Sequence, residues 1–306
     1  MPYGFNDDKS KVSFESYLKP CAYDVIEMSS RGGRDLTQVF ADEIANYSDE
    51  WAWISNRIHY SRYDGIYIGD FIPLEFERTS YPAGTVHHNM RIAKIEGDYM
   101  SVRLPYKDVN IARNTSHVFF VSDAVVYLQS TGGATNNNGT ADNPCPYCAS
   151  KMNKFLNETM FDQLPAKVRS VIDTRYLYSA PIRYASGQVL TDDELWSWDG
   201  MSSPVELGKL WVPFEVEVFG TGVLGNGTYG CAGLQQFPLF KEEANRMLCY
   251  EGYGDESFYN YEWWTASAVA GSSTEWVKVS KRGCPMRGEL QQGYAPLCFM
   301  LNSYTF

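Results

Sequence analysis

Two pairs of neighbouring residues have side chains that could bind a metal ion or carry out thiol chemistry. Cys145 and Cys148 have the CxxC spacing of zinc ligands and redox dithiols, but no second CxxC or HxxxH pair exists to complete a structural zinc site. The alternative is a loop pair or a local disulfide. His87 and His88 are adjacent, so in a strand their rings would point to opposite faces and could not chelate one ion. We therefore expect one packed and one exposed imidazole, no metal site and no cofactor.

A short acidic run, Asp192–Glu194, stands directly before Leu195 and Trp196. Carboxylates at the start of a helix interact favourably with its dipole, so this run is expected to cap a helix. Calcium binding would need further spaced oxygen ligands, which the run lacks. The sequence also has no Gly-x-Ser-x-Gly elbow, P-loop or HExxH motif. These observations predict a protein that is not an enzyme.

The charge and composition of the chain disfavour several classes of protein. It carries 37 acidic and 26 basic residues, a net charge of -11, so a nucleic-acid backbone would be repelled and no nucleic-acid partner is expected. No run of apolar residues is long enough to span a bilayer, which predicts no membrane insertion. Seven cysteines are too few for a disulfide scaffold of this length. Aromatic residues make up 15% of the chain, a chemistry used by β-rich cores and by binding surfaces.

The elements that would position these residues follow from hydrophobic spacing. Asp35 is expected to cap a helix over residues 36–44, and a second helix covers 51–58. Runs of alternating or apolar residues then predict a twisted antiparallel sheet with strands at 68–76, 90–95 and 118–121. Helical spacing returns at 149–161 and again after Pro165.

The C-terminal half contains short strand-like segments divided by glycine turns. A strand pair is expected across 174–184, and further segments lie at 209–212, 216–219, 262–267, 275–279 and 294–301. Residues 1–34 are polar and irregular, which is typical of an extended arm. We therefore expect an α+β domain over residues 35–306, with irregular antiparallel strands, two or more flanking helices and long loops, preceded by this N-terminal arm.

Several motifs between residues 50 and 301 occur in a characteristic order. They are Ile68–Asp70, Met90–Ile92, Asn153–Asn157, Phe161, Leu164-Pro165, Val171-Ile172, Leu210–Gly220, Tyr261–Ser267 and Gly293–Phe299. The chain resembles in these motifs an uncharacterised domain family common in Gram-positive bacteria and their phages. That family is similar to the C-type-lectin-like fold shared by formylglycine-generating enzymes and by variable receptor-binding proteins of some phages. The resemblance therefore implies a C-type-lectin-like domain.

The first residues of the chain, Met1–Lys11, resemble the start of virion proteins from phages of gut Firmicutes. This resemblance implies a protein of the virion surface that is made in the bacterial host cytoplasm. The N-terminal arm would then dock onto other virion proteins through Tyr3, Phe5 and Phe14. We also expect self-association as a homo-oligomer, with a trimer favoured.

Aromatic and basic residues of the C-terminal third form the candidate binding surface for a host glycan or protein. Aromatic rings stack on sugar faces and anchor interfaces, although core packing also uses many Trp residues. The candidates are Tyr259, Tyr261, Trp276, Lys278, Lys281 and Arg287.

Three functions are compatible with the sequence. The first is a phage virion surface protein, attached to fibre, tail or capsid, whose lectin-like domain binds the host surface. The second is a capsid decoration or head-fibre protein with a structural role and no receptor binding. The third is an enzyme of the formylglycine-generating type, which would need two copper-binding thiolates. Cys284 and Cys298 are the candidates for that pair, and Cys298 is expected to be a core residue.

Overall fold

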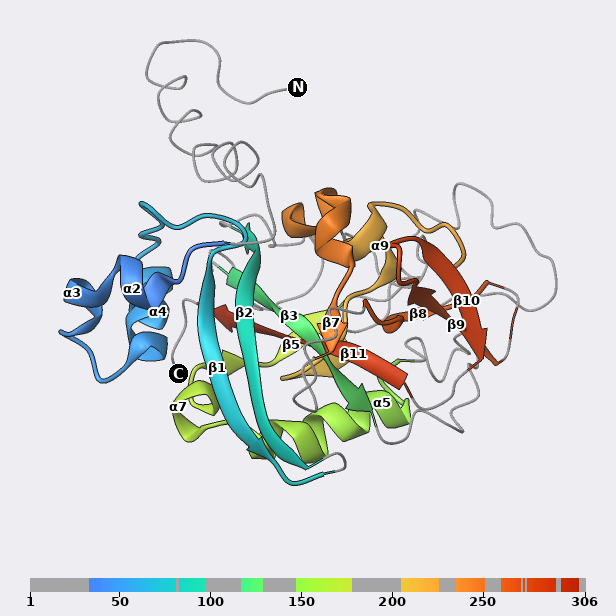
Figure 1. Ribbon diagram of the computed structural model, residues 1–306, viewed down its shortest axis with the longest axis horizontal. Coiled ribbons are helices and arrows are strands. Elements are labelled where there is room, and N and C mark those ends of the chain that lie inside the picture. Colours follow the sequence, from blue (N-terminus) through green and yellow to red (C-terminus); the bar gives the residue numbers. More distant parts are fainter. Residues whose placement is uncertain are drawn as a thin grey trace, which may run out of the picture.

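The structure is a computed structural model that describes residues 33–80, 83–96, 117–128, 147–177, 205–225, 235–250, 260–270, 272, 274–289 and 293–302. These residues form one large, mostly antiparallel sheet with short helices around it (Figure 1). The predicted α+β class is therefore confirmed. Among the described residues, none of the helices combines the length and the apolar character that a membrane crossing needs.

The described part of the chain contains a nine-stranded sheet and a separate two-stranded one. The strand order of the large sheet is β1 (Phe71–Arg78), β2 (Gly84–Glu96), β3 (His117–Leu128), β11 (Gly293–Asn302), β8 (Trp263–Ala268), β9 (Glu275–Val279) and β10 (Pro285–Glu289). Two short strands join at the sides: β4 (Ile172–Asp173) pairs with β11, and β7 (Cys249–Tyr250) pairs with β3. The small sheet pairs β5 (Arg175–Leu177) with β6 (Val205–Gly208). The last strand thus lies between β3 and β8 and joins the two halves of the chain.

Strand β1 lies at one edge of the large sheet, and its residues alternate between buried and outward-facing positions. Ile72, Leu74 and Phe76 are buried, whereas the residues between them face outward. The predicted strand began at Ile68, but the structure begins it at Phe71. The difference arises because the preceding residues form a turn, in which Gly69 has a φ of 92°. The buried carboxylate of Asp70 closes this turn by accepting a hydrogen bond from the Tyr67 N–H.

Three short helices, α2 (Leu36–Val39), α3 (Ala41–Ile44) and α4 (Glu50–His59), form a helical lobe at one end of the molecule. Asp35 caps α2 as predicted, accepting a hydrogen bond from the Thr37 N–H at 2.9 Å. Asp49 caps α4 in the same way, through the Ala52 N–H at 2.8 Å. The helix predicted over 36–44 is split at Phe40, whose φ of -116° interrupts it.

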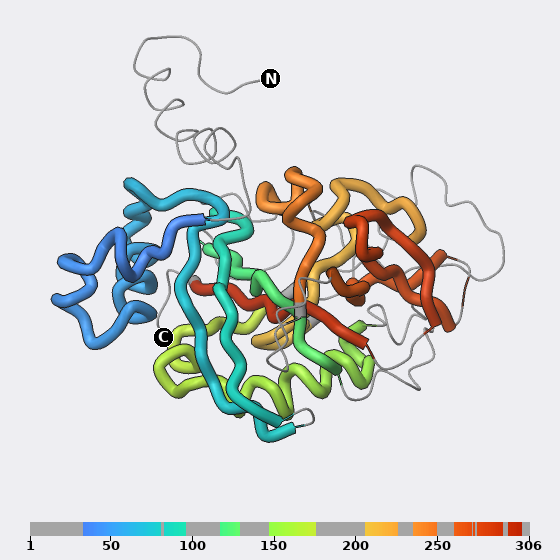
Figure 2. The backbone as a smooth tube through the Cα atoms, viewed as in Figure 1, coloured from blue at the N-terminus to red at the C-terminus, as the bar shows by residue number. Residues whose placement is uncertain are grey.

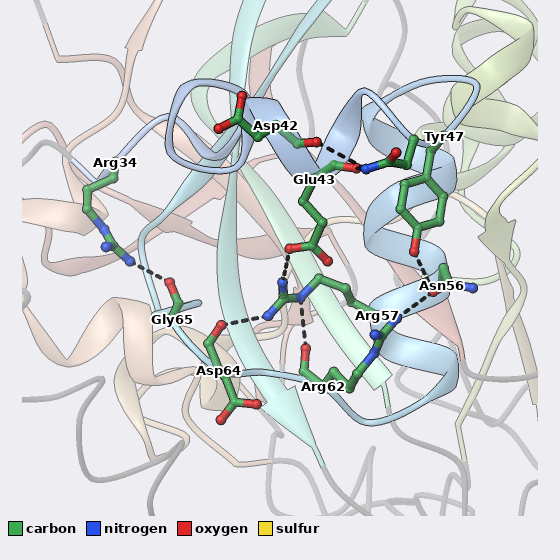
Figure 3. A network of polar contacts seen from close by, with 10 residues as sticks. Arg34, Asp42, Glu43, Tyr47, Asn56, Arg57, Arg62, Asp64 and Gly65 are labelled. Atoms are coloured by element: carbon green, nitrogen blue, oxygen red, sulfur yellow. Dashed lines mark hydrogen bonds and ion pairs between the residues drawn. The ribbon is translucent and has the colours of Figure 1, made fainter.

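The buried guanidinium of Arg57 holds the helical lobe together (Figure 3). It donates to the Glu43 carboxylate at 2.6 Å, to the Arg62 carbonyl at 3.0 Å and to the Asp64 carbonyl at 2.6 Å. Its cationic carbon also lies 4.8 Å from the centre of the Phe40 ring. A single side chain therefore ties α3, α4 and the turn that leads to β1.

The predicted helix at 149–161 is a continuous helical run made of α5 (Lys151–Phe155), the π-helical turn η2 (Leu156–Met160) and α6 (Phe161–Gln163); α7 (Ala166–Arg169) follows. Asn157 lies in the π-helical turn, and its Oδ1 accepts the Lys209 and Leu210 N–H groups at 2.7 and 3.0 Å. Gly208 passes close by with a φ of 101°, and a Cβ there would lie 2.5 Å from the Asn157 amide. The π-helical turn thus directs the Asn157 side-chain amide toward the loop that follows β6.

The strand predicted at 216–219 is wrong, because these residues form the helix α9 (Glu215–Phe219). The Glu217 carboxylate accepts the Phe214 N–H at 2.9 Å at the start of the helix. Gly220, with a φ of 80°, ends it in the left-handed conformation. Two 3-10 turns, η4 (Pro238–Lys241) and η5 (Glu243–Arg246), follow further along the chain. A short apolar run does not distinguish a strand from a buried helix, and here the caps decide.

Both faces of the sheet are covered. Phe119 and Phe120 are consecutive in β3 and therefore point to opposite faces. The Phe120 ring packs against Trp51 of α4 at 5.8 Å, whereas Phe119 packs against Trp211 and Phe237 at 6.1 and 5.5 Å. Figures 1 and 2 show the helical lobe (blue) and the β8–β10 strands (red) at opposite ends of the long axis. Strands β8, β9 and β10 therefore lie away from the helical lobe, whereas Phe299 of β11 contacts Trp51 of α4 at 5.7 Å between ring centres.

Candidate ligand-binding surface

Strands β8, β9 and β10 form an antiparallel unit whose hairpin presents a basic tip. The turn between β9 and β10 is closed by hydrogen bonds from the Ser280 N–H to the Cys284 carbonyl at 2.8 Å and from the Gly283 N–H to the Ser280 carbonyl at 2.9 Å. Gly283 has a φ of 75°, a conformation that glycine adopts without strain. Lys281 is exposed at this tip, and its carbonyl accepts the Asn260 side-chain amide at 3.3 Å. The hairpin is thereby fixed to the segment that precedes β8.

Lys278 lies along the sheet surface instead of extending into solvent. Its Nζ is 4.2 Å from the centre of the Trp264 ring and 3.9 Å from a Glu262 carboxylate oxygen. A Cβ at Gly288 would lie 2.6 Å from the Lys278 Cε, so the glycine makes room for the lysine stem. The side chain is only 20% exposed, so most of it is covered by these neighbours.

Four of the predicted surface residues lie on this unit or directly beside it. Arg287 on β10 is 55% exposed and lies 3.7 Å from the Glu275 carboxylate. Tyr261, two residues before β8, is partly exposed. Lys278 is paired with Met286 and Arg287 with Val277, so the Lys278 and Arg287 side chains point to opposite faces of the unit, while Lys281 lies in the turn between β9 and β10.

The assignment of Trp276 to this surface is corrected by the structure. Its side chain is fully buried, and its ring centre lies 6.5 Å from that of Tyr147, which precedes α5. This contact spans distant parts of the sequence, so the period of β9 alone could not reveal it. Tyr259 and the predicted arm residues Tyr3, Phe5 and Phe14 lie outside the described residues.

Three partly buried tyrosines, Tyr127, Tyr294 and Tyr261, form a cluster that we call the tyrosine row. The rings of Tyr261 and Tyr294 are 4.8 Å apart between centres at an interplanar angle of 60°. Those of Tyr294 and Tyr127 are 5.5 Å apart at 63°. Tyr127 and Tyr294 are direct cross-strand partners in β3 and β11. The row therefore joins three segments that are far apart in sequence.

Sequence reasoning did not identify Tyr127 or Tyr294 as site residues. The predicted strand at 118–121 ended before Tyr127, whereas β3 continues to Leu128. Along β3 every residue is buried except Asp123 and Tyr127, which are partly exposed. A tyrosine near the end of an otherwise apolar run was the available signal, because its hydroxyl favours contact with water.

The model of one protein family, described as Domain of unknown function (DUF6273), matches residues 115–298, more than half of the chain. The chain belongs to this family. No curated protein and no solved structure gives a significant match. The DUF6273 domain includes all three members of the tyrosine row and the whole of β8, β9 and β10. Strands β1 and β2 and the helical lobe precede it, and the two strands extend its sheet beyond β3.

The two candidate thiols of the DUF6273 domain have different surroundings. Cys284 is exposed in the β9–β10 turn, whereas Cys298 on β11 is fully buried, as predicted. Burial raises the pKa of the Cys298 thiol well above its ordinary value, and the Glu217 carboxylate adds to this effect, while Arg175 partly offsets it. Within the described residues, no group of three or more His, Cys, Asp or Glu side chains is placed to hold a metal ion. Cys145 lies outside those residues.

The adjacent histidines point to opposite faces of β2, as predicted. His88 is 3% exposed, whereas the His87 side chain is 63% exposed and lies 3.0 Å from the Glu75 carboxylate. Burial lowers the pKa of His88 to about 4; the Ala124 backbone opposes this shift, and the charges of Arg78 and His87 add to it. Neither ring nitrogen of His88 makes a hydrogen bond of normal geometry. The two imidazoles therefore do not form a metal-binding pair.

A second polar cluster lies where β2 separates from β3 and β7 takes its place. The Asp123 carboxylate accepts the Asn89 N–H at 2.9 Å and the Asn89 amide at 2.7 Å. Arg91 donates to the Asn245 side chain at 2.9 Å. Burial raises the pKa of Asp123 and lowers the pKa of Arg91, and the attraction between the two charges opposes both shifts. These side chains replace strand pairing at the edge of the DUF6273 sheet, which is a structural role.

Proposed function

We propose that the protein is a phage virion surface protein that attaches to polymers or proteins of the host cell surface. In this proposal residues 35–306 form a C-type-lectin-like domain, and the arm of residues 1–34 joins it to other virion proteins in a homo-oligomer. The supporting observation is that the exposed cations Lys281 and Arg287 lie on the β9–β10 hairpin, with Tyr261 of the tyrosine row two residues before β8 of the same unit. Tyrosine and arginine are enriched in binding surfaces because each offers a large contact area with a polar end.

The hairpin unit suits attachment because its side chains are positioned before any ligand arrives. Lys278 is held between Trp264 and Glu262, and the tip is fixed by Asn260. A preorganised surface loses little side-chain entropy on binding. This supports a binding role for the C-terminal strands over a purely structural one.

A cell-binding experiment tests the proposal. We expect the labelled full chain to bind cells of the bacterium infected by the phage, and K281A/R287A to bind about fivefold more weakly, because it removes two exposed cations of the hairpin. Lys167→Ala is the matched control, since this exposed lysine lies on α7, outside the hairpin. Binding is measured by flow cytometry over a range of protein concentrations.

The same preparation separates the alternatives. Incorporation into particles that depends on residues 1–34, without any cell binding, would identify a decoration or head-fibre protein. Undiminished cell binding by K281A/R287A would remove the hairpin from the proposal. Copper-dependent turnover that is lost on Cys284→Ser would point to the enzyme alternative.

A further inference from the structure

We propose that the outer edge of β10 pairs with the same edge of a second copy of this chain, so that two sheets join about a two-fold axis. The inference deepens the self-association within the proposed function and rests on that part alone, not on attachment to the host. Strand β10 ends the strand order of the large sheet, and within the described part of the chain β9 is its only partner (Figure 1). An unpaired edge presents main-chain donors and acceptors that can bind another strand.

The hairpin turn fixes which residues of β10 bond to β9. The Ser280 N–H donates to the Cys284 carbonyl at 2.8 Å, and the register that pairs Pro285 with Val279 places Ser280 and Cys284 directly opposite each other. They therefore form a hydrogen-bonded pair, and such pairs alternate with non-hydrogen-bonded pairs along antiparallel strands. Every second residue after Cys284 then bonds to β9, and the residues between them direct their main-chain groups to the open edge.

The main-chain groups of Pro285, Arg287 and Glu289 thus point to the open edge. Proline has no N–H, so the edge offers the N–H groups of Arg287 and Glu289 and the carbonyls of all three residues. Among the described residues, neither of these N–H groups donates a hydrogen bond to another segment. The side chains of Arg287 and Glu289 are exposed. The edge therefore retains both the donors and the acceptors that strand pairing needs.

The charges on this edge favour one antiparallel alignment of two copies. With the two-fold axis at Gly288, Arg287 of each copy lies opposite Glu289 of the other, and each such pair exchanges both main-chain hydrogen bonds. Opposite charges on directly opposed residues stabilise a strand pair. With the axis at Arg287, arginine would face arginine, which is unfavourable. The edge is therefore complementary to itself in the first alignment.

Glu289 also lies beside a like charge within its own chain. The register of β9 and β10 places it directly opposite Glu275, and the Arg287 guanidinium lies 3.7 Å from the Glu275 carboxylate. Like charges in this position destabilise a strand pair. The arginine of a second copy would lie on the other side of Glu289 and offset this repulsion, so pairing of two chains is favoured electrostatically at this edge.

Strand β1, at the other end of the sheet, is a poor edge for pairing with itself. The Phe71 N–H donates to the Arg34 carbonyl, away from β2, so the main-chain groups of Pro73, Glu75 and Glu77 point outward as well. Pro73 removes one donor, and both glutamates are exposed. Two copies of this edge aligned at their glutamates would bring like charges together. The self-complementary edge is thus that of β10, and the expected homo-oligomer is a closed dimer.

This pairing is compatible with the proposed role of the hairpin in attachment. Side chains stand roughly perpendicular to a sheet, so Arg287 remains on the sheet face when the strands pair. Lys281 lies in the turn, outside the paired residues. Each chain of the dimer therefore keeps its own hairpin tip, and a host surface that offers many copies of a ligand would bind the dimer with higher avidity.

Sedimentation velocity of the full chain, over a range of concentrations, tests the inference. We expect a monomer–dimer equilibrium whose dissociation constant rises about tenfold in Arg287→Glu and in Glu289→Arg, because attraction becomes repulsion in both symmetric pairs. The double variant R287E/E289R restores opposite charges and should dimerise within about threefold of the unchanged chain. Lys154→Glu is the matched control, since it makes the same kind of charge change at an exposed residue of α5, and it should dimerise normally.

The recovery in the double variant distinguishes pairing at this edge from a general effect of charge. A monomer at every concentration, a trimer, or single variants that dimerise as the unchanged chain does would overturn the inference. So would a double variant that remains as weak as the single ones. Thermal unfolding identifies variants that fail to fold, and either single variant together with the double variant keeps the test valid. A monomer that binds cells would overturn this inference alone, whereas a dimer that binds no cells would overturn only the attachment.

Discussion

Replacing Arg175 by methionine is expected to lower the free energy of unfolding by about 3–5 kcal/mol. Arg175 forms an ion pair with Glu217, and the two side chains are only 6% and 1% exposed. The guanidinium also lies between the rings of Phe119 and Trp211, at 5.0 and 4.8 Å from their centres. Removing the arginine leaves the Glu217 carboxylate buried without its counter-charge, and that desolvation penalty dominates the effect. Urea unfolding at neutral pH measures it.

Two further variants separate the buried charge from the loss of packing. R175M/E217Q should regain much of the lost stability, because no unpaired charge remains and the glutamine can still accept the Phe214 N–H. Arg287→Met breaks an exposed pair with Glu275 and should cost less than about 1 kcal/mol. Equal losses for Arg175→Met and Arg287→Met would contradict this account of the buried pair.

Features governed by local spacing were predicted well from the sequence. Asp35 caps its helix, and the strand predicted at 275–279 has the bounds of β9. The opposite orientation of His87 and His88 and the burial of Cys298 also follow from strand alternation and residue type. Each depends on interactions within a few residues or on a simple preference for the interior, which a single sequence expresses directly.

Features that depend on strand order could not be predicted in this way. The burial of Trp276 requires Tyr147, and the tyrosine row requires β3, β11 and the segment before β8 to meet. Periodicity gives each strand two faces but does not say which strands are neighbours. The helix at 216–219 was missed for a different reason, because its caps at Glu217 and Gly220 outweigh an apolar run that fits either structure.

His88 is expected to make the protein less stable in mild acid, by about 3 kcal/mol between pH 7 and pH 4. Burial holds its pKa near 4 in the folded chain, against 6.5 when it is exposed in the unfolded chain. Between these values the unfolded chain binds a proton that the folded chain does not, so stability falls as the pH drops through this window. Below the folded pKa both states are protonated, and this loss reaches its limit.

The comparison of His88→Leu with His87→Leu isolates this contribution from that of the carboxylates. His88→Leu removes two buried ring nitrogens that make no hydrogen bond of normal geometry, so its stability at pH 7 should be equal to or higher than that of the unchanged chain. Its loss between pH 7 and pH 4 should be smaller by about 3 kcal/mol. His87→Leu changes an exposed ring and should keep the full acid sensitivity. Urea unfolding at pH 4, 5, 6 and 7 measures all three proteins, and parallel pH profiles for both variants would show that the buried imidazole is not the source.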